Sequence, residues 1–436
     1  MANGEFRRVE PAARMGCVPS RPTATARAVA PASASGSTIR PALLLTLALL
    51  GAFAPIATDL YLPGFPAIGH DLGSDASGVQ LTLTTFLAGL ALGQLVMGPL
   101  SDRFGRRTPL VASAAACVVA GVVSAVAPTL TVLVIARLVQ GFAGAGGMVI
   151  GRALIADLVT GRAAAKAFTL MLTVGGVAPV LAPLVGGLLS DPIGWRGMLW
   201  TVTGLCVLML LAVVVVVPET RPRTARRSAH GVPYATAVRR VLGSRGYWCN
   251  TAVFAFSFGM MMSYISASPF VYQNVLGLSE VQYGVAFGVN AAGLIGAGAV
   301  VGRLVDQVSP RSIVSASAVL QVTATAVFVV LVLLDAPGWT YAVAIFLAVL
   351  SNGGIMGSSA ALAMGHVREV AGTGSALLGF SQFALGAVVS PLVGLGGEHS
   401  ALAPAVVMAS SSALVGVFSR LARRTGIPAA RAAPDN

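Results

Sequence analysis

The sequence predicts an all-α integral membrane protein in which twelve transmembrane helices form two six-helix bundles. Hydrophobic residues make up 56% of the 436 residues and charged residues 10%, whereas charged residues make up about 25% of a soluble domain. Apolar runs of about 20 residues, the length a helix needs to cross a bilayer, recur along the chain. Basic residues are concentrated in every second connection between these runs, which is typical of a membrane protein with a fixed orientation.

The twelve apolar runs are the predicted spans. In the first half of the chain they cover residues 42–61, 79–98, 108–127, 130–150, 167–189 and 197–217. In the second half they cover residues 248–268, 283–302, 312–334, 339–363, 373–394 and 402–419. The predicted domains are a disordered N-terminal tail (1–40), an N-terminal six-helix bundle (41–217), a basic linker (218–247), a C-terminal six-helix bundle (248–419) and a C-terminal tail (420–436). Within the linker we expect an interfacial helix over residues 234–241.

The basic residues determine the expected orientation. If the N-terminus is cytoplasmic, 26 of the 28 Lys and Arg residues lie in cytoplasmic segments, and only Arg137 and Arg196 do not. The positive-inside bias therefore explains the net charge of +13, and nucleic acid is not an expected partner. Residues 1–40 hold no apolar stretch typical of a cleaved signal peptide, although Met15 is an alternative start. We expect a monomer in the bacterial cell membrane, with both termini and the linker in the cytoplasm.

A short charged segment, residues 98–107, separates the second and third spans. Its notable residues are Gly98, Asp102, Arg103, Gly105, Arg106 and Arg107. One interpretation is a charge latch that stabilises one orientation of the two bundles, with Asp157 as a further candidate partner. The other is a solvated loop that only sets topology. This GxxxDxxGRR pattern between two apolar runs resembles the loop after the second span of major facilitator superfamily transporters.

The two halves of the chain also resemble each other. The Gly, Asp and Arg of the charged segment recur with identical spacing after the eighth span. The residues of this second gating repeat are Gly302, Asp306 and Arg311. Two six-span halves that hold a substrate between them near the midplane are the arrangement of this transporter superfamily.

Two charged residues fall within or near predicted spans. Arg137 lies inside residues 130–150, where an Arg at mid-bilayer costs at least about 2.5–3.5 kcal/mol. We therefore expect it to face the protein interior and a partner, or to be held by backbone carbonyls in a structural role. Asp59 is the only acid expected within a span, unless the first span ends near it and places it at the outer surface.

These residues carry a further resemblance. The pattern Asp59-x-x-x-Pro63-x-x-Pro66 resembles the first-span signature of twelve-span drug:proton antiporters. The pattern that starts at Arg137 and continues through Gln140 resembles their fourth-span motif, whose Arg is associated with proton transfer.

The fifth span carries the antiporter helix motif of the same transporters. Its matching residues are Pro179, Pro183, Gly186 and Gly187, with Ala182 in place of the usual Gly. The prolines remove helix hydrogen bonds, and the glycines permit close helix approach. Residues 268–279 are also similar to the Bcr/CflA group, which includes bicyclomycin and chloramphenicol exporters, and this group is the best match.

The resemblance implies export of a small amphipathic antibiotic in exchange for protons, by alternating access and without catalytic residues, a cofactor or a metal. In this interpretation Asp59 carries the proton and Arg137 shifts the proton affinity of the acid. Candidates for the cavity lining, each explained equally well by helix-to-helix hydrogen bonding, are Gln94, Gln140, Asn250, Asn290, Asn352 and Gln382. The alternatives are a proton-coupled symporter for a sugar-like nutrient, which needs more polar groups in the cavity, and a non-transporting membrane receptor or enzyme. The chain holds no HExxH, nucleophile-elbow or phosphate-loop motif.

Overall fold

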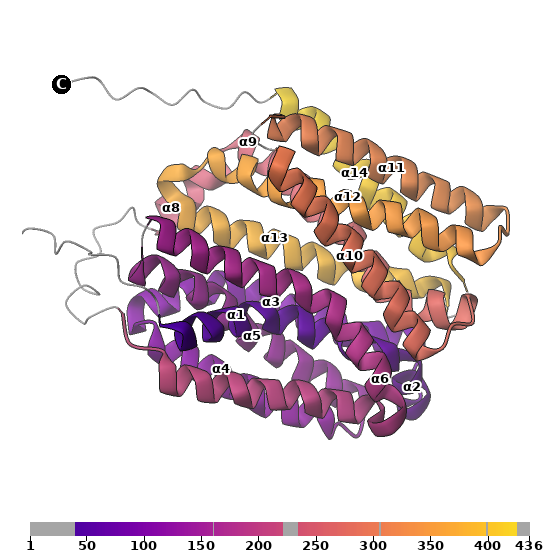
Figure 1. Ribbon diagram of the computed structural model, residues 1–436, viewed down its shortest axis with the longest axis horizontal. Coiled ribbons are helices and arrows are strands. Elements are labelled where there is room, and N and C mark those ends of the chain that lie inside the picture. The colour runs from indigo at the N-terminus through magenta and orange to yellow at the C-terminus, as the bar shows by residue number, and fades with distance from the viewer. Residues whose placement is uncertain (1–39, 160, 221–233, 305–306, 398–399, 425–436) are drawn as a thin grey trace, which may run out of the picture. The chain divides into compact units, whose positions relative to one another are not determined.

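The computed structural model describes residues 40–159, 161–220, 234–304, 307–397 and 400–424, and its regular elements are helices (Figure 1). The α-helices are α1 (Pro41–Asp59), α2 (Phe65–Leu72), α3 (Ala76–Phe104), α4 (Arg107–Ala125), α5 (Leu130–Leu158), α6 (Gly161–Val216), α8 (Tyr234–Leu242), α9 (Arg245–Pro269), α10 (Glu280–Leu304), α11 (Pro310–Leu333), α12 (Gly338–Gly365), α13 (Ala371–Leu392) and α14 (Leu402–Arg424). Four short helical turns join them: η1 (Leu62–Gly64), η2 (Phe270–Val275), η3 (Arg368–Val370) and η4 (Val393–Gly396).

Among the described residues, 11 helices are long and apolar enough to cross a membrane. One of them, α6, bends sharply at Gly194, where φ is 61° and ψ is −178°. A helix cannot continue through this backbone conformation, which glycine adopts more easily than any other residue. The bend separates a first arm (161–193) from a second arm (195–216), and each arm exceeds the roughly 20 residues of a membrane span. Counting the arms separately gives the twelve crossings that the sequence predicts.

Several helices extend beyond the apolar runs that predict them. The α3 helix continues to Phe104, so most of the charged segment is helical and only Gly105 and Arg106 form the turn, with φ of 92° at Gly105. The α5 helix likewise continues to Leu158 rather than ending near residue 150. The segment expected to be a charged loop is therefore mainly the end of α3. Hydropathy identifies only the apolar part of a helix, so it misses a polar helix end that extends beyond the membrane. The linker helix α8 covers residues 234–242, close to the expected 234–241.

The helices pack as two groups. In the N-half, α5 packs against α3 and α4, and α6 packs against α1 and α4; in the C-half, α9 packs against α12, α13 and α14, and α11 against α12 and α14. The halves meet along two seams, α3 with α13 and α6 with α10. We call the end with the Gly105–Arg106 turn and α8 the basic end, and the end with α2 and η2 the opposite end (Figure 1).

Candidate functional site

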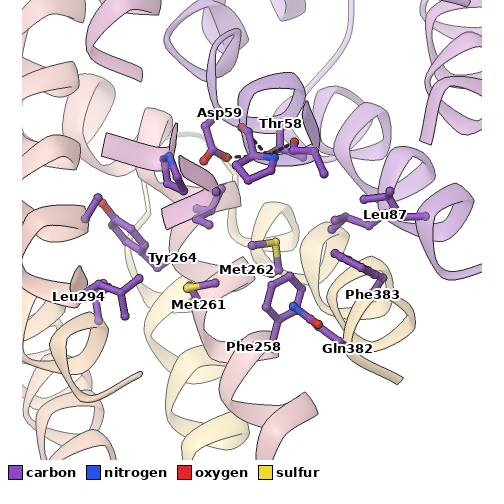
Figure 2. Close-up of a pocket in the computed structure, with 18 of the residues that line it drawn as sticks. Thr58, Asp59, Leu87, Phe258, Met261, Met262, Tyr264, Leu294, Gln382 and Phe383 are labelled. Atoms are coloured by element: carbon purple, nitrogen blue, oxygen red, sulfur yellow. Dashed lines mark hydrogen bonds between the residues drawn. The ribbon is translucent and has the colours of Figure 1, made fainter. Parts of the chain in front are cut away.

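A cavity of about 210 Å³ lies between the N-half and the C-half, and helices of both halves contribute to its wall. Most of its lining is apolar. Aromatic rings and methionines provide much of this surface (Figure 2), namely Met148, Phe258, Met261, Met262, Phe287 and Phe383. The polar side chains among the lining residues are those of Thr58, Asp59, Tyr264 and Gln382. The cavity therefore suits a compact, largely apolar molecule that carries a few polar groups.

Asp59 is the last residue of α1 and the acidic residue of the cavity lining (Figure 2). Its side chain is 2% exposed, and Thr58 Oγ1 donates a hydrogen bond to its Oδ1 at 2.8 Å. Among the described residues, no Lys, Arg or His forms an ion pair with it. Asp59 therefore ends α1 but lies within a candidate span that continues to Leu72, and it is buried.

Arg137 lies inside α5 with 0% of its side chain exposed. Its Nη1 donates to Gln140 Oε1 at 2.7 Å, and its Nη2 donates to the Ala57 carbonyl at 2.7 Å. The guanidinium lies over the rings of Tyr61 and Phe86, 4.5 and 4.2 Å from their centroids. Because Ala57 is at the carboxyl end of α1, the cation is placed where the helix dipole is negative. These contacts, rather than an ion pair with Asp59, satisfy the guanidinium.

At the basic end, the segment 98–107 organises a cluster around Arg106, which is 8% exposed. Its Nε donates to Asp157 Oδ2 at 2.9 Å, and its Nη1 donates to Asp102 Oδ1 at 2.8 Å and to Ser101 Oγ at 2.7 Å. Burial alone would lower the pKa of Arg106, but the hydrogen bonds and charges of Asp157 and Asp102 outweigh it and raise the pKa above its usual value. The structure thus brings together three of the residues expected to form a latch: Asp102, Arg106 and Asp157. Of the others, Gly98 lies within α3 and Arg103 lies over the Phe104 ring.

Glu219 is a further member of this cluster that the sequence did not single out. Its two carboxylate oxygens accept hydrogen bonds from the backbone N–H groups of Arg106 and Arg107, at 2.9 and 3.3 Å. These groups start α4, where helix N–H groups lack partners within the helix and favour a negative charge. Glu219 therefore attaches the start of the linker to α4. The sequence signal that could have identified Glu219 is its position, because it is an acidic residue directly after the last span of the N-half.

The structure describes two of the three residues of the second gating repeat. Gly302 is exposed near the end of α10, Asp306 lies outside the described residues, and Arg311 is in the first turn of α11. Nearby, the imidazole of His366 packs against Gly246 at the start of α9. Burial, and then the charge of Arg311, lower the pKa of His366 from its usual value.

Of the six neutral polar candidates, Gln382 lines the cavity. The other five make contacts between or within helices. Gln94 accepts from Arg152, Gln140 accepts from Arg137, Asn250 donates to the Gly246 carbonyl, Asn290 donates to Tyr264 and Tyr272, and Asn352 accepts from Ser257. They act as helix-to-helix or intrahelical hydrogen-bonding groups rather than as lining residues.

The antiporter helix motif lies in the first arm of α6 and contacts both halves. Pro179 lines the cavity. A Cβ on Gly186 would collide with the Leu60 carbonyl oxygen, and one on Gly187 would lie 2.6 Å from the Glu280 carbonyl oxygen. A Cβ on Gly284 would lie 2.9 Å from the Pro183 carbonyl oxygen. The small residues therefore allow α6 to touch α1 on one side and α10 on the other.

The sequence of the chain matches the model of a known protein family. The chain belongs to the Major Facilitator Superfamily, whose family model matches residues 47–391. It is accordingly a multi-pass membrane transporter and not an enzyme.

Several proteins are similar to this chain in sequence over most of its length. The uncharacterized MFS-type transporter YdgK of Bacillus subtilis (strain 168) is 34% identical over 358 residues, which are 82% of this chain and 89% of that protein. The bicyclomycin resistance protein homolog of Haemophilus influenzae is 29% identical over 366 residues, 80% of this chain and 88% of that protein. The multidrug resistance protein MdtL of Klebsiella pneumoniae is 29% identical over 252 residues, 57% of this chain and 64% of that protein.

Solved structures show the same fold at low identity. A D-xylose-proton symporter superimposes with a TM-score of 0.72 at 16% identity, over 87% of this chain and 96% of that chain. A bacterial homolog of the human lysosomal transporter Spinster, in an inward-facing and unoccupied conformation, superimposes with a TM-score of 0.69 at 18% identity, over 92% of this chain and 100% of that chain.

Proposed function

We propose that this protein exports a small amphipathic antibiotic from the bacterial cytoplasm in exchange for protons, by alternating access of the cavity to the two sides of the membrane. The observation that carries the proposal is the cavity between the halves, which is mostly apolar and has a single carboxyl group in its lining. The names of two relatives, which refer to bicyclomycin and multidrug resistance, support an antibiotic as the substrate. Chloramphenicol-like and bicyclomycin-like compounds are the proposed class.

Asp59 is the proposed proton carrier. A charged carboxylate without a cationic partner is costly in a buried site, and Asp59 also ends α1, where the helix dipole disfavours negative charge. Binding a proton removes both costs. Because Asp59 lines the cavity, drug and proton can alternate in the same space.

Arg137 is proposed to support coupling through α1 rather than by direct pairing. Its hydrogen bond to the Ala57 carbonyl fixes the backbone two residues before Asp59. The flanking rings of Tyr61 and Phe86 hold the guanidinium plane in place. Arg137→Ala is therefore expected to leave the end of α1 without its fixed contact and to abolish uphill export.

The cluster around Arg106 is the proposed latch of the basic end, which we place in the cytoplasm together with both termini and the linker. Its ion pairs connect the end of α3 with the end of α5, and Glu219 adds the start of the linker. A change in the angle between these helices must break or rearrange charge-assisted hydrogen bonds, which are stronger than neutral ones. The cluster can therefore stabilise one arrangement of the N-half helices and of the start of the linker that leads to the C-half.

A sugar-like symporter fits the cavity less well. The similarity to a D-xylose-proton symporter concerns the fold, since only 16% of residues are identical. A sugar presents hydroxyl groups around its whole surface, and each buried hydroxyl needs a hydrogen-bond partner. The lining offers four polar side chains, and one of these is the proposed proton site.

The test is drug-induced proton release from energised inverted vesicles of a pump-deficient host, after a resistance profile across an antibiotic panel has identified a transported drug. Asp59→Asn mimics the protonated acid and is expected to keep some drug binding while losing uphill export. Asp335→Asn is the matched control, because Asp335 is exposed outside the cavity and its φ of 47° is tolerated by Asn. Proton release at the parental ratio in Asp59→Asn would assign the carrier role to another residue.

A further inference from the structure

Two polar side chains lie one helical turn beyond the cavity, toward the basic end. On α5, Arg152 follows the lining residue Met148 by four positions, and on α3, Gln94 follows the lining residue Leu90 by four positions. Both helices run toward the basic end, because their last turns carry the carboxylates that bind Arg106. Residues four apart share a helix face, so Arg152 and Gln94 lie on the faces of α5 and α3 that line the cavity.

The side chain of Arg152 turns back toward the cavity. Its Nε donates a hydrogen bond to the Met148 carbonyl at 3.0 Å, and its Nη2 donates to Gln94 Oε1 at 3.4 Å. The residue is partly exposed, and among the described residues no Asp or Glu forms an ion pair with it. A cation inside a membrane protein is normally paired. The charge of Arg152 is therefore available to a negative group that enters the cavity.

Gln94 adds hydrogen-bond donors that also lack an acceptor. The residue is 1% exposed, and its Oε1 accepts from Arg152, which fixes the orientation of the amide because a rotated amide would direct N–H groups at a guanidinium. Its buried Nε2 donates to no group in the described part of the chain. A Cβ on Gly379 of α13 would lie 2.9 Å from Gln94 Oε1, so the C-half covers this side chain. A buried donor without an acceptor is costly, and few occur in folded proteins.

The carboxyl group of the cavity lies toward its other end. Asp59 follows Gly51 by eight positions on α1, and both residues line the cavity, so the lining extends over about 12 Å along α1. Figure 2 shows Asp59 and Gln382 on opposite sides of the space, with apolar side chains between them. Gln382 lies one turn from Gly379, which covers Gln94. A molecule that fills the cavity therefore has an acid near one end and the Arg152 cation near the other.

We propose that Arg152 and Gln94 bind the oxyanion of an amphipathic acid, a carboxylate or phosphonate, whose apolar part fills the cavity. A guanidinium and an amide nitrogen only donate, and an oxyanion only accepts, so each satisfies the other through charge-assisted hydrogen bonds. An inorganic anion has no apolar part for the cavity and binds more weakly. The site adds amphipathic acids to the proposed substrates, and only their export, not their binding, rests on the proposed function.

The probes are 4-butylbenzoate and its neutral counterpart 4-butylbenzamide, which have the same apolar part. Binding of each to purified full-length protein in detergent is measured by equilibrium dialysis at neutral pH. The parent is expected to bind the carboxylate about tenfold or more tightly than the amide, because hydrogen bonds between charged groups are stronger than neutral ones. Partition of the probes into detergent is the same for every variant and cancels in the comparison.

Three variants test the assignment. Arg152→Gln removes the cation and should abolish the preference for the carboxylate. Arg303→Gln is the matched control, because Arg303 is exposed in the last turn of α10 and its loss changes the net charge at the basic end equally. Gln94→Glu provides an oxyanion within the chain, beside Arg152, and should also abolish the preference. This variant keeps the size of the side chain and pairs the cation, so it remains decisive if Arg152→Gln does not fold.

Equal affinity of the parent for both probes would overturn the site, and so would a preference retained in Arg152→Gln or in Gln94→Glu. A preference lost in Arg303→Gln as well would assign it to the net charge of the basic end and would also overturn the site. Because dialysis requires no transport, the expected pattern without export of any antibiotic would overturn the proposed function and leave the site standing. Export of an antibiotic by a protein without the preference would overturn the site alone.

Discussion

Gln273→Leu is expected to weaken the seal between the halves at the opposite end. The hydrogen bonds between described residues of the N-half and the C-half lie at this end: Gln273 Nε2 donates to the Pro63 carbonyl at 3.1 Å, and Gln80 Nε2 donates to the Ser266 carbonyl at 3.2 Å. The ring of Phe65 also approaches that of Phe270, at 6.2 Å between centroids. The conformation described here is therefore the one closed at the opposite end.

The size of the effect follows from the contact that is lost. A neutral hydrogen bond contributes about 0.5–1.5 kcal/mol net, and the lower part of this range applies because Gln273 is only half-buried. A loss of about 0.5–1 kcal/mol from the closed conformation alone shifts the equilibrium toward conformations open at this end by about two- to fivefold. Leu keeps most of the side-chain volume, so the packing of η2 should change little.

The assay measures how often the cavity opens to the opposite end. A reporter cysteine replaces Met261, which lines the cavity and is partly buried, in a background without the four native cysteines. A membrane-impermeant maleimide is applied to intact cells, on the side where we place the opposite end. Gln273→Leu should raise the labelling rate by about two- to fivefold if opening limits the reaction.

Gln282→Leu is the control for this experiment. Gln282 is exposed at the same end, but its Oε1 accepts from the Ser279 N–H within the C-half, and its side chain has no hydrogen bond to a described residue of the N-half. Its removal should leave the labelling rate unchanged. An unchanged rate in Gln273→Leu, or an equal increase in both variants, would show that the hydrogen bond to Pro63 does not hold the seal.

Three further predictions concern orientation, the latch and pH. A reporter active only outside the cell should be silent when fused after Arg227 and active when fused after Gly397, and the reverse pattern would invert the topology. Asp157→Asn should slow drug–proton exchange more than Asp102→Asn, because Asp157 is 30% exposed and Asp102 is 54% exposed, so water screens the second ion pair more. The lowered pKa of His366 means that the folded state binds a proton less readily than the unfolded state, so thermal stability in detergent should fall as pH drops below about 6.5, and His366→Gln should reduce this loss.

Hydropathy and charge were sufficient to predict the long helices and the number of crossings, because each span must satisfy the same bilayer thickness, whereas the short helix α2 was not predicted. Their ends were less predictable. The α3 helix continues to Phe104 because a helix end at a polar surface can carry charged side chains, and it stops where Gly105 adopts a φ of 92°. The bend of α6 at Gly194 falls in the expected connection between the predicted spans 167–189 and 197–217, although the two arms are joined by a single bent glycine rather than by a loop.

Partners across long sequence separations were beyond prediction from one sequence. Arg106, Arg103 and Arg107 are equivalent by composition, yet Arg106 is the one held between two carboxylates. Its backbone also binds Glu219, 113 residues away. Only the packing of α3, α4 and α5 decides which arginine is central.

The interior charges show the same limit. The sequence correctly placed Arg137 in the interior, and the resemblance suggested that it acts on the proton affinity of Asp59. The structure satisfies Arg137 with a carbonyl, an amide and two rings. Asp59 lines the cavity instead of pairing with Arg137. Of the two expectations for Arg137, the one in which backbone carbonyls hold the side chain is closer to the observed contacts.

The end of α1 connects the proposed proton site to the seal. Ala57 holds Arg137, Asp59 lines the cavity, and Pro63 accepts the hydrogen bond from Gln273. A neutral Asp59 suits the closed, buried arrangement, whereas a charged one gains hydration when the opposite end opens. Asp59→Asn should therefore slow labelling of the Met261→Cys reporter from that end, in contrast to Gln273→Leu, and acidification should slow labelling only when Asp59 is present. A labelling rate that is unaffected by either change would separate proton binding at Asp59 from closure of the opposite end.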